Sequence, residues 1–151
     1  MIERNKNIFR ILLAVSTGIL LVQTILLVVL GDDTITRIVL PLVFILGGLG
    51  TGVMFVYFTL NPQYNRNYTL RKRDGRWQWE RVTYGPDPDG LRHISAGVGA
   101  LMTDLLFAVI SASVLWPEVV TEKVMTIAVV ALLLAFCIIY CTIEHKLRKQ
   151  L

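Results

Sequence analysis

Four long apolar segments constrain this chain of 151 residues more than any other feature. They cover residues 11–30, 38–60, 94–116 and 124–143, and the only charged residue within them is Asp104 in the third. An α-helix rises about 1.5 Å per residue, so segments of this length cross a hydrocarbon core of about 30 Å. The sequence therefore predicts four transmembrane helices, over about residues 8–30, 35–60, 93–116 and 122–144.

The basic residues are distributed unequally between the two sides of these segments. Thirteen of the fifteen Lys and Arg residues precede the first segment, follow the fourth or lie between the second and third, and only Arg37 and Lys123 lie on the other side. Cytoplasmic loops of membrane proteins carry such an excess of Lys and Arg. We therefore expect a multi-pass protein of the cell membrane whose two termini and 61–92 loop are cytoplasmic. Because contact with the lipid bilayer accounts for the net charge of +4, we expect no nucleic-acid partner.

The connections between the segments are short, and they leave little chain outside the membrane. The sequence predicts an all-α membrane fold, with residues 1–151 in a single integral membrane domain. Gly31 to Thr34 is a turn cluster, and either Asp33 or Thr34 is suited to cap the next helix. We expect a four-transmembrane-helix bundle made of two antiparallel helical hairpins.

The 61–92 loop contains a different pattern. Asp74-Gly75 lies between two segments rich in β-forming residues, and this dipeptide predicts a cytoplasmic β-hairpin between helices 2 and 3. A two-stranded hairpin is only marginally stable in water, so we expect it to lie against the membrane surface or a protein. The residues that we expect to dock there are aromatic or basic: Trp77, Trp79, Arg71, Lys72, Arg73 and Arg76.

Asp104 is the residue least expected in a membrane-spanning segment, because an Asp at the centre of a transmembrane helix costs about 2.5 to 3.5 kcal/mol on insertion into the bilayer. We expect it to face protein, with hydroxyl or amide partners among Thr17, Gln23 and Thr51. No Lys or Arg lies at that depth, so a neutral Asp104 that donates an interhelical hydrogen bond is one interpretation. The alternatives are a proton or cation site in a transport path, and a contact with a partner subunit.

Small residues recur around Asp104 at intervals of four, which allows another helix to approach closely. We expect the third helix to pack this small face on the first and second. The predicted packing residues come from the second and third helices: Gly48, Gly52, Ala96, Ala100 and Ala108.

No set of residues predicts an enzyme, a cofactor or a metal. Cys137 and Cys141 lie in the fourth segment, where we expect them to be reduced. Cys141, His145 and His93 are the only candidate ligands for a soft metal at one depth, and we predict no metal site there. The glycine-rich stretch 47–52 lacks the Lys of a phosphate-binding loop and is embedded in an apolar segment.

These features favour a non-enzymatic membrane protein that acts by association. It would be an accessory or regulatory subunit, or an effector that docks a cytoplasmic protein through its basic aromatic loop. The alternative is a homo-oligomeric channel or transporter that uses Asp104, since one four-helix bundle encloses little space for a pore. The expected partners are therefore the lipid bilayer and either another protein or further copies of the chain.

Overall fold

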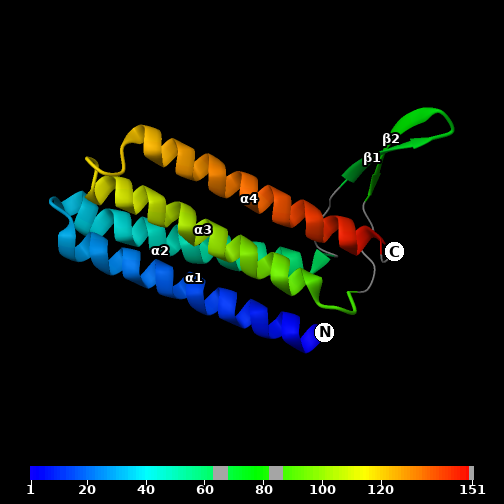
Figure 1. The fold of residues 1–151 in the computed structure, drawn as a ribbon, viewed down its shortest axis with the longest axis horizontal. Coiled ribbons are helices and arrows are strands. Elements are labelled where there is room, and N and C mark those ends of the chain that lie inside the picture. The colour runs from blue at the N-terminus through cyan, green and yellow to red at the C-terminus, as the bar shows by residue number, and fades with distance from the viewer. Residues whose placement is uncertain (63–67, 82–86, 150–151) are drawn as a thin grey trace.

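The computed structural model describes residues 1–62, 68–81 and 87–149 of the chain. It contains four long helices in this part of the chain: α1 (Ile2–Leu30), α2 (Leu40–Leu60), α3 (Leu91–Leu115) and α4 (Glu122–Lys149). A hairpin of strands β1 (Tyr68–Arg73) and β2 (Arg76–Arg81) lies between α2 and α3 (Figure 1). Each helical span is long and apolar enough to cross a membrane. The predictions of four long helices and one hairpin are therefore confirmed.

Two helices are longer than the apolar segments within them. α1 begins at Ile2 and α4 continues to Lys149, beyond the predicted limits of 8 and 144. The added turns consist largely of Glu, Lys and Arg, which are good helix formers. At the start of α1, Lys6 Nζ lies 3.6 Å from Glu3 Oε1, a spacing of three residues that supports the helix.

The second span begins with an unusual turn. Residues Ile35–Val39 form a wide π-helical turn, η1, which continues directly into α2. Pro41 has no N–H and its ring would clash with the carbonyl of Arg37 in a regular α-helix, and a wider turn relieves this conflict. Asp33 caps the turn, since its Oδ1 accepts a hydrogen bond of 2.7 Å from the Thr36 N–H.

α3 is the central helix of the bundle, because it packs against α1, α2 and α4. α1 packs more extensively on α3 than on α2, although α1 and α2 are connected by a short turn. Both α1 and α3 run from the end that carries the N-terminus to the opposite end (Figure 1). The helices of each connected pair, α1 with α2 and α3 with α4, run antiparallel, and the most extensive contact joins the two parallel helices α1 and α3 (Figure 1).

Small residues on α3 make this close packing possible. Ser95, Ala96, Gly97, Gly99 and Ala100 are all buried. At Gly97, an added Cβ would lie 2.9 Å from Leu12 Cδ1 on α1, and at Gly99 it would overlap the Phe55 ring on α2. The side chains of α1 and α2 therefore occupy the space that a larger residue on α3 would need.

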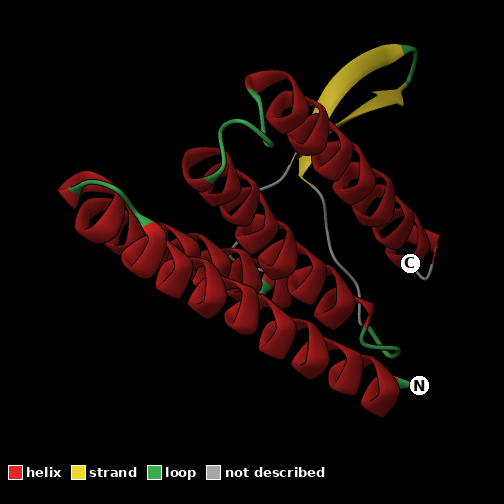
Figure 2. Ribbon diagram, turned by 60° about the vertical axis from the view of Figure 1, so that its left-hand side comes forward, coloured by secondary structure: helices red, strands yellow, loops and turns green. Residues whose placement is uncertain are grey.

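α4 lies at the edge of the bundle (Figure 2). It packs on α3, and its Phe136 ring meets the Phe55 ring of α2 with centroids 5.9 Å apart. No residue of its most apolar 18-residue stretch is buried. The outward surface of α4 is thus almost wholly apolar and uncovered within the described chain.

The hairpin has the turn that its sequence predicts. Asp74 and Gly75 both have positive φ, at 50° and 78°, as a type I′ turn requires. Leu70 pairs with Trp79 and Lys72 with Trp77, so these four residues share one face. On the other face, Arg73 Nε forms an ion pair with Glu80 Oε1 at 2.6 Å.

Candidate functional site

A buried carboxyl joins the two parallel helices at the centre of the bundle. Asp104 lies halfway along α3, and only 5% of its surface is exposed. The hydroxyl of Ser16 on α1, which is equally buried, donates a hydrogen bond to Asp104 Oδ2. Asp104 Oδ1 is buried beside Gly48 of α2 and has no hydrogen-bond partner among the described residues. Asp104 on α3 thus contacts both of the other helices at this point, α1 through Ser16 and α2 through Gly48.

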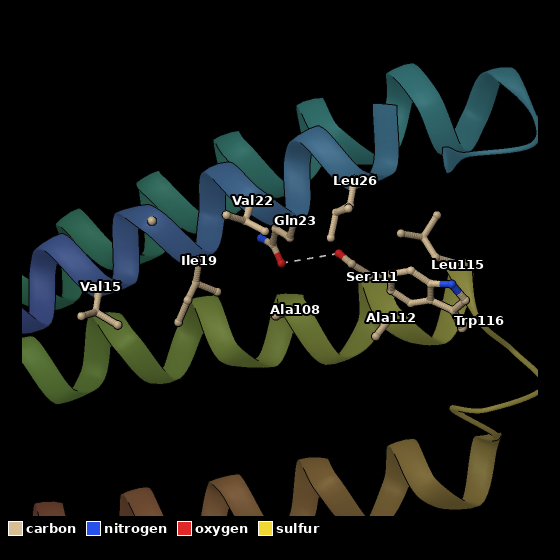
Figure 3. A pocket seen from close by; sticks show the side chains of 11 residues that line it. Val15, Ile19, Val22, Gln23, Leu26, Ala108, Ser111, Ala112, Leu115 and Trp116 are labelled. Carbon is tan, nitrogen blue, oxygen red and sulfur yellow. Dashed lines mark hydrogen bonds between the residues drawn. The ribbon is translucent and has the colours of Figure 1, made fainter. Parts of the chain in front are cut away.

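A second polar pair lies further along the same two helices. Gln23 of α1 and Ser111 of α3 are both buried, and Ser111 Oγ lies 3.5 Å from Gln23 Oε1 (Figure 3). Ser111 Oγ also donates a shorter bond of 2.9 Å to the Phe107 carbonyl. Gln23 Nε2 has no partner in the described chain. Both pairs join residues 88 apart in the sequence, which indicates one constant register between the parallel helices.

The structure separates some of the residues that we expected near Asp104. Thr51 is exposed on α2 and Gln23 meets Ser111, while Thr17 is exposed on α1 but lines the same groove as Asp104. The hydroxyl that meets Asp104 therefore comes from Ser16, one residue before the predicted Thr17. Because consecutive residues of a helix differ by about 100° in direction, Ser16 faces α3 and Thr17 does not.

Two grooves adjoin these polar pairs. The first, which we call the Asp104 groove, has a volume of about 440 Å³ and lies between α1, α2 and α3. Its lining includes Ser16, Leu20, Gly48, Val56, Asn61 and Asp104. The second, the Gln23 groove, has about 450 Å³ between α1 and α3 and is almost wholly apolar, with Val15, Val22, Ala108 and Trp116 around Gln23 (Figure 3). Each groove thus places two buried polar side chains beside an apolar wall, Ser16 and Asp104 in the first and Gln23 and Ser111 in the second.

The predicted packing residues differ in their surroundings. Ala96, Ala100 and Gly48 are buried, and an added Cβ at Gly48 would lie 3.1 Å from both Asp104 Oδ1 and Leu20 Cδ1. Ala108 is half-buried beside the Gln23 groove. Gly52 has open space where a Cβ would lie, because it borders the Asp104 groove. Gly52 therefore leaves room in the groove and does not admit a neighbouring helix.

The hairpin presents its aromatic residues to the surroundings. Trp77 and Trp79 are 65% and 72% exposed, and Tyr68 and Leu70 lie on the same face. The predicted docking residues are divided by the strand register. Lys72 accompanies the two tryptophans, whereas the three arginines of the set lie on the other face: Arg71, Arg73 and Arg76. The hairpin thus has one aromatic face and one strongly basic face.

The cysteines and histidines do not converge within the described chain. Cys137 and Cys141 are exposed on α4, and so is His145. His93 is half-buried at the start of α3, where its ring meets Phe9 edge-on with centroids 5.6 Å apart. No group of three or more His, Cys, Asp or Glu side chains is placed to hold a metal ion in the described residues.

Sequence reasoning missed two sets of contacts at the start of α3, one that satisfies its first N–H groups and one that attaches it to the start of α1. Asp87 Oδ1 and Oδ2 accept hydrogen bonds of 2.9 Å from the N–H groups of Leu91 and Arg92. Asn5 Nδ2 of α1 donates to the Asp89 carbonyl at 2.6 Å. The first of these contacts is local, because Asp87 lies four residues before α3 and its carboxylate satisfies two of the N–H groups that a helix start leaves unpaired. The second has no local signal, because it joins residues 84 apart.

No known protein family, curated protein or solved structure matches this chain. Its function must therefore be argued from the site geometry alone. Two features need an explanation beyond folding: the exposed aromatic face of the hairpin and the buried, partly unpaired carboxyl of Asp104.

Proposed function

We propose that this chain is a multi-pass protein of the cell membrane that acts by association and docks a cytoplasmic protein through its hairpin. In this arrangement α1 to α4 cross the bilayer, and both termini and the hairpin lie in the cytoplasm. The distribution of Lys and Arg supports this orientation. Figure 1 places both ends of the described chain and the hairpin at the same end of the bundle.

The exposed aromatic face of the hairpin is the observation that carries this proposal. Trp, Tyr and Arg are the residues that contribute most to protein interfaces, and a contiguous exposed patch of large apolar side chains commonly marks an interaction site. Within the described residues the sheet has only these two strands, and the outer edge of such a sheet can accept a further strand from a partner. Lys72 and Arg81 border the aromatic face, so the expected partner has an apolar pocket with an acidic rim.

Affinity purification from a mild detergent tests the proposal. Trp77→Ala combined with Trp79→Ala should release the partner, as should deletion of residues 66–84. Gln78→Ala is the matched control, because Gln78 lies on the opposite face of β2 and should leave the partner bound. The partner should then bind the purified wild-type protein directly. The same captured proteins from all four forms, or none from any, would contradict the proposal.

A second candidate function is a homo-oligomeric channel or transporter that uses Asp104. The specific observation in its favour is the unpaired Asp104 Oδ1 beside a groove, halfway along a helix long enough to cross a membrane. Intramembrane carboxyls of this kind commonly mark ion or proton paths. Proton and monovalent-cation flux into liposomes should fall when Asp104→Asn replaces the wild type. Equal flux in both, or no flux in either, removes Asp104 from that role.

A further inference from the structure

We propose that the Asp104 groove binds a hydrophobic organic cation, a molecule with one positive group on an apolar body. This inference names the ligand class of the second candidate function, and it requires binding but no transport. It rests on three properties of the groove: an incompletely paired buried carboxyl, apolar walls without a basic residue, and open space that small residues maintain.

The carboxyl provides the recognition of charge. Ser16 satisfies one oxygen of Asp104, while Oδ1 has no hydrogen-bond partner among the described residues. The groove lining contains no Lys, Arg or His, so no side chain there neutralises the carboxylate. Oδ1 lies beside Gly48, which itself lines the groove, so this oxygen is at the groove wall while Oδ2 keeps its bond from Ser16. A ligand cation bound in the groove would then supply the missing counter-charge.

The apolar walls of the groove determine what kind of body the ligand has. Leu13, Leu20, Val53 and Val56 give the groove an apolar surface, and its volume of about 440 Å³ is typical of sites for small organic molecules. A neutral lipid chain would fill this space and leave the carboxyl unpaired. An inorganic cation would need several oxygen ligands and would leave the apolar volume empty. A hydrophobic organic cation both neutralises the Asp104 carboxylate and fills the apolar space of the groove.

The open space depends on glycines of α2. No atom lies within 4 Å of where a Cβ would be at Gly52, which lines the groove. Gly50 has equally open space but does not line the groove. An added Cβ at Gly52 therefore projects into the groove without meeting protein, whereas one at Gly50 meets no protein and lies outside the groove lining.

The groove also has an accessible second end. It extends along α2 from Gly48 to Tyr57 and Asn61, and thirteen residues of helix span about 20 Å. Asn61 follows the last residue of α2, at the end of the bundle where the chain termini lie (Figure 1). A ligand can thus enter near the polar Tyr57 and Asn61 and move along the apolar wall to Asp104.

Equilibrium binding of radiolabelled tetraphenylphosphonium to the full chain in lipid nanodiscs tests this inference, with empty nanodiscs as the blank. The wild type should bind the cation saturably. Asp104→Asn keeps the shape of the side chain and should weaken binding at least tenfold, and Gly52→Leu should do the same. Gly50→Leu is the matched control for folding and insertion, and it should bind like the wild type.

Neutral triphenylphosphine oxide distinguishes recognition of charge from hydrogen bonding by a protonated acid. It resembles the cation in shape, carries no charge and accepts hydrogen bonds, so it should not displace the phosphonium from the wild type. Displacement by the oxide at similar concentrations would overturn the inference. So would the absence of saturable binding, or equal affinity in the wild type, Asp104→Asn and Gly52→Leu. Binding without liposome flux contradicts transport alone and leaves this inference intact.

Discussion

The buried polar residues show which properties of single residues can be read from the sequence and which cannot. An Asp in the middle of an apolar segment must face protein or water, so the position of Asp104 in the bundle was predictable. Its partner was not, because Ser16 and Thr17 are adjacent and both carry hydroxyls. The choice between them depends on the rotation of α1 about its axis, and contacts with α3 determine that rotation. Tertiary packing therefore decides the identity of the partner.

Two helical glycines, which have the same intrinsic helix propensity, should respond differently to substitution. Gly99→Ala should lower the free energy of unfolding in detergent by about 1 to 3 kcal/mol, because the new Cβ overlaps the Phe55 ring. Gly50→Ala meets no atom within 4 Å and should be neutral or stabilising by up to about 1 kcal/mol. Unfolding by titration with a denaturing detergent measures both. Equal effects would show that α2 and α3 do not pack as described.

Asp33 should make stability depend on pH at acid values. The Thr36 backbone N–H donates to the Asp33 carboxylate and lowers its pKa from the ordinary value of 3.8. A depressed pKa in the folded state stabilises the fold above the unfolded value, and this contribution is lost as pH falls through the folded pKa. We therefore expect the difference in melting temperature between wild type and Asp33→Ala to shrink below about pH 4. A difference that stays constant from neutral pH down to pH 3 would contradict this account.

At the scale of elements, local signals specified the hairpin and the four long helices, but not the extra turns of α1 and α4, and the register of α1 on α3 needed a longer pattern. Asp74-Gly75 predicts its own turn type, because both residues tolerate positive φ. Two polar residues on each helix mark the register, and both sets have the same spacing of seven residues. On α1 they are Ser16 and Gln23, and on α3 they are Asp104 and Ser111. Two parallel helices with equal spacing bring both pairs together at once. That spacing is present in the sequence, and the small residues of α3 predicted α1 as a neighbour, but the spacing does not tell whether Ser16 or Thr17 faces Asp104.

Cross-linking should report this register directly. In a chain with Cys137→Ala and Cys141→Ala, a short thiol-specific cross-linker should join Ser16→Cys to Asp104→Cys, because the native side chains are hydrogen-bonded. It should not join Gln23→Cys to Asp104→Cys, since the two positions differ by seven residues, or about 10 Å along the helix. The shift of each product on a denaturing gel distinguishes intramolecular linkage from dimers. Equal yields from both pairs would contradict the parallel register.

At the scale of the whole molecule, apolar length predicted the number of spanning helices but not their neighbours. In a membrane the lipid-facing surface of a helix is as apolar as its buried surface, so hydrophobic patterning does not identify the packed side. α4 illustrates this, because it is strongly apolar and yet has no buried residue in its most apolar stretch. The small residues of α3 provided the available signal, and they correspond to the centre of the bundle. The uncovered surface of α4 also leaves an area for lipid or for another copy of the chain.

Orientation across the membrane is the most direct test, because docking through the hairpin requires it to face the cytoplasm. In the chain with Cys137→Ala and Cys141→Ala, single cysteines replace Asp32 and Val119 in the two short turns, or Gln78 in β2. A membrane-impermeant maleimide should label Asp32→Cys and Val119→Cys on intact cells. It should label Gln78→Cys only after the membrane is permeabilised. Labelling of Gln78→Cys on intact cells, or equal labelling of all three positions before permeabilisation, would contradict four crossings with a cytoplasmic hairpin.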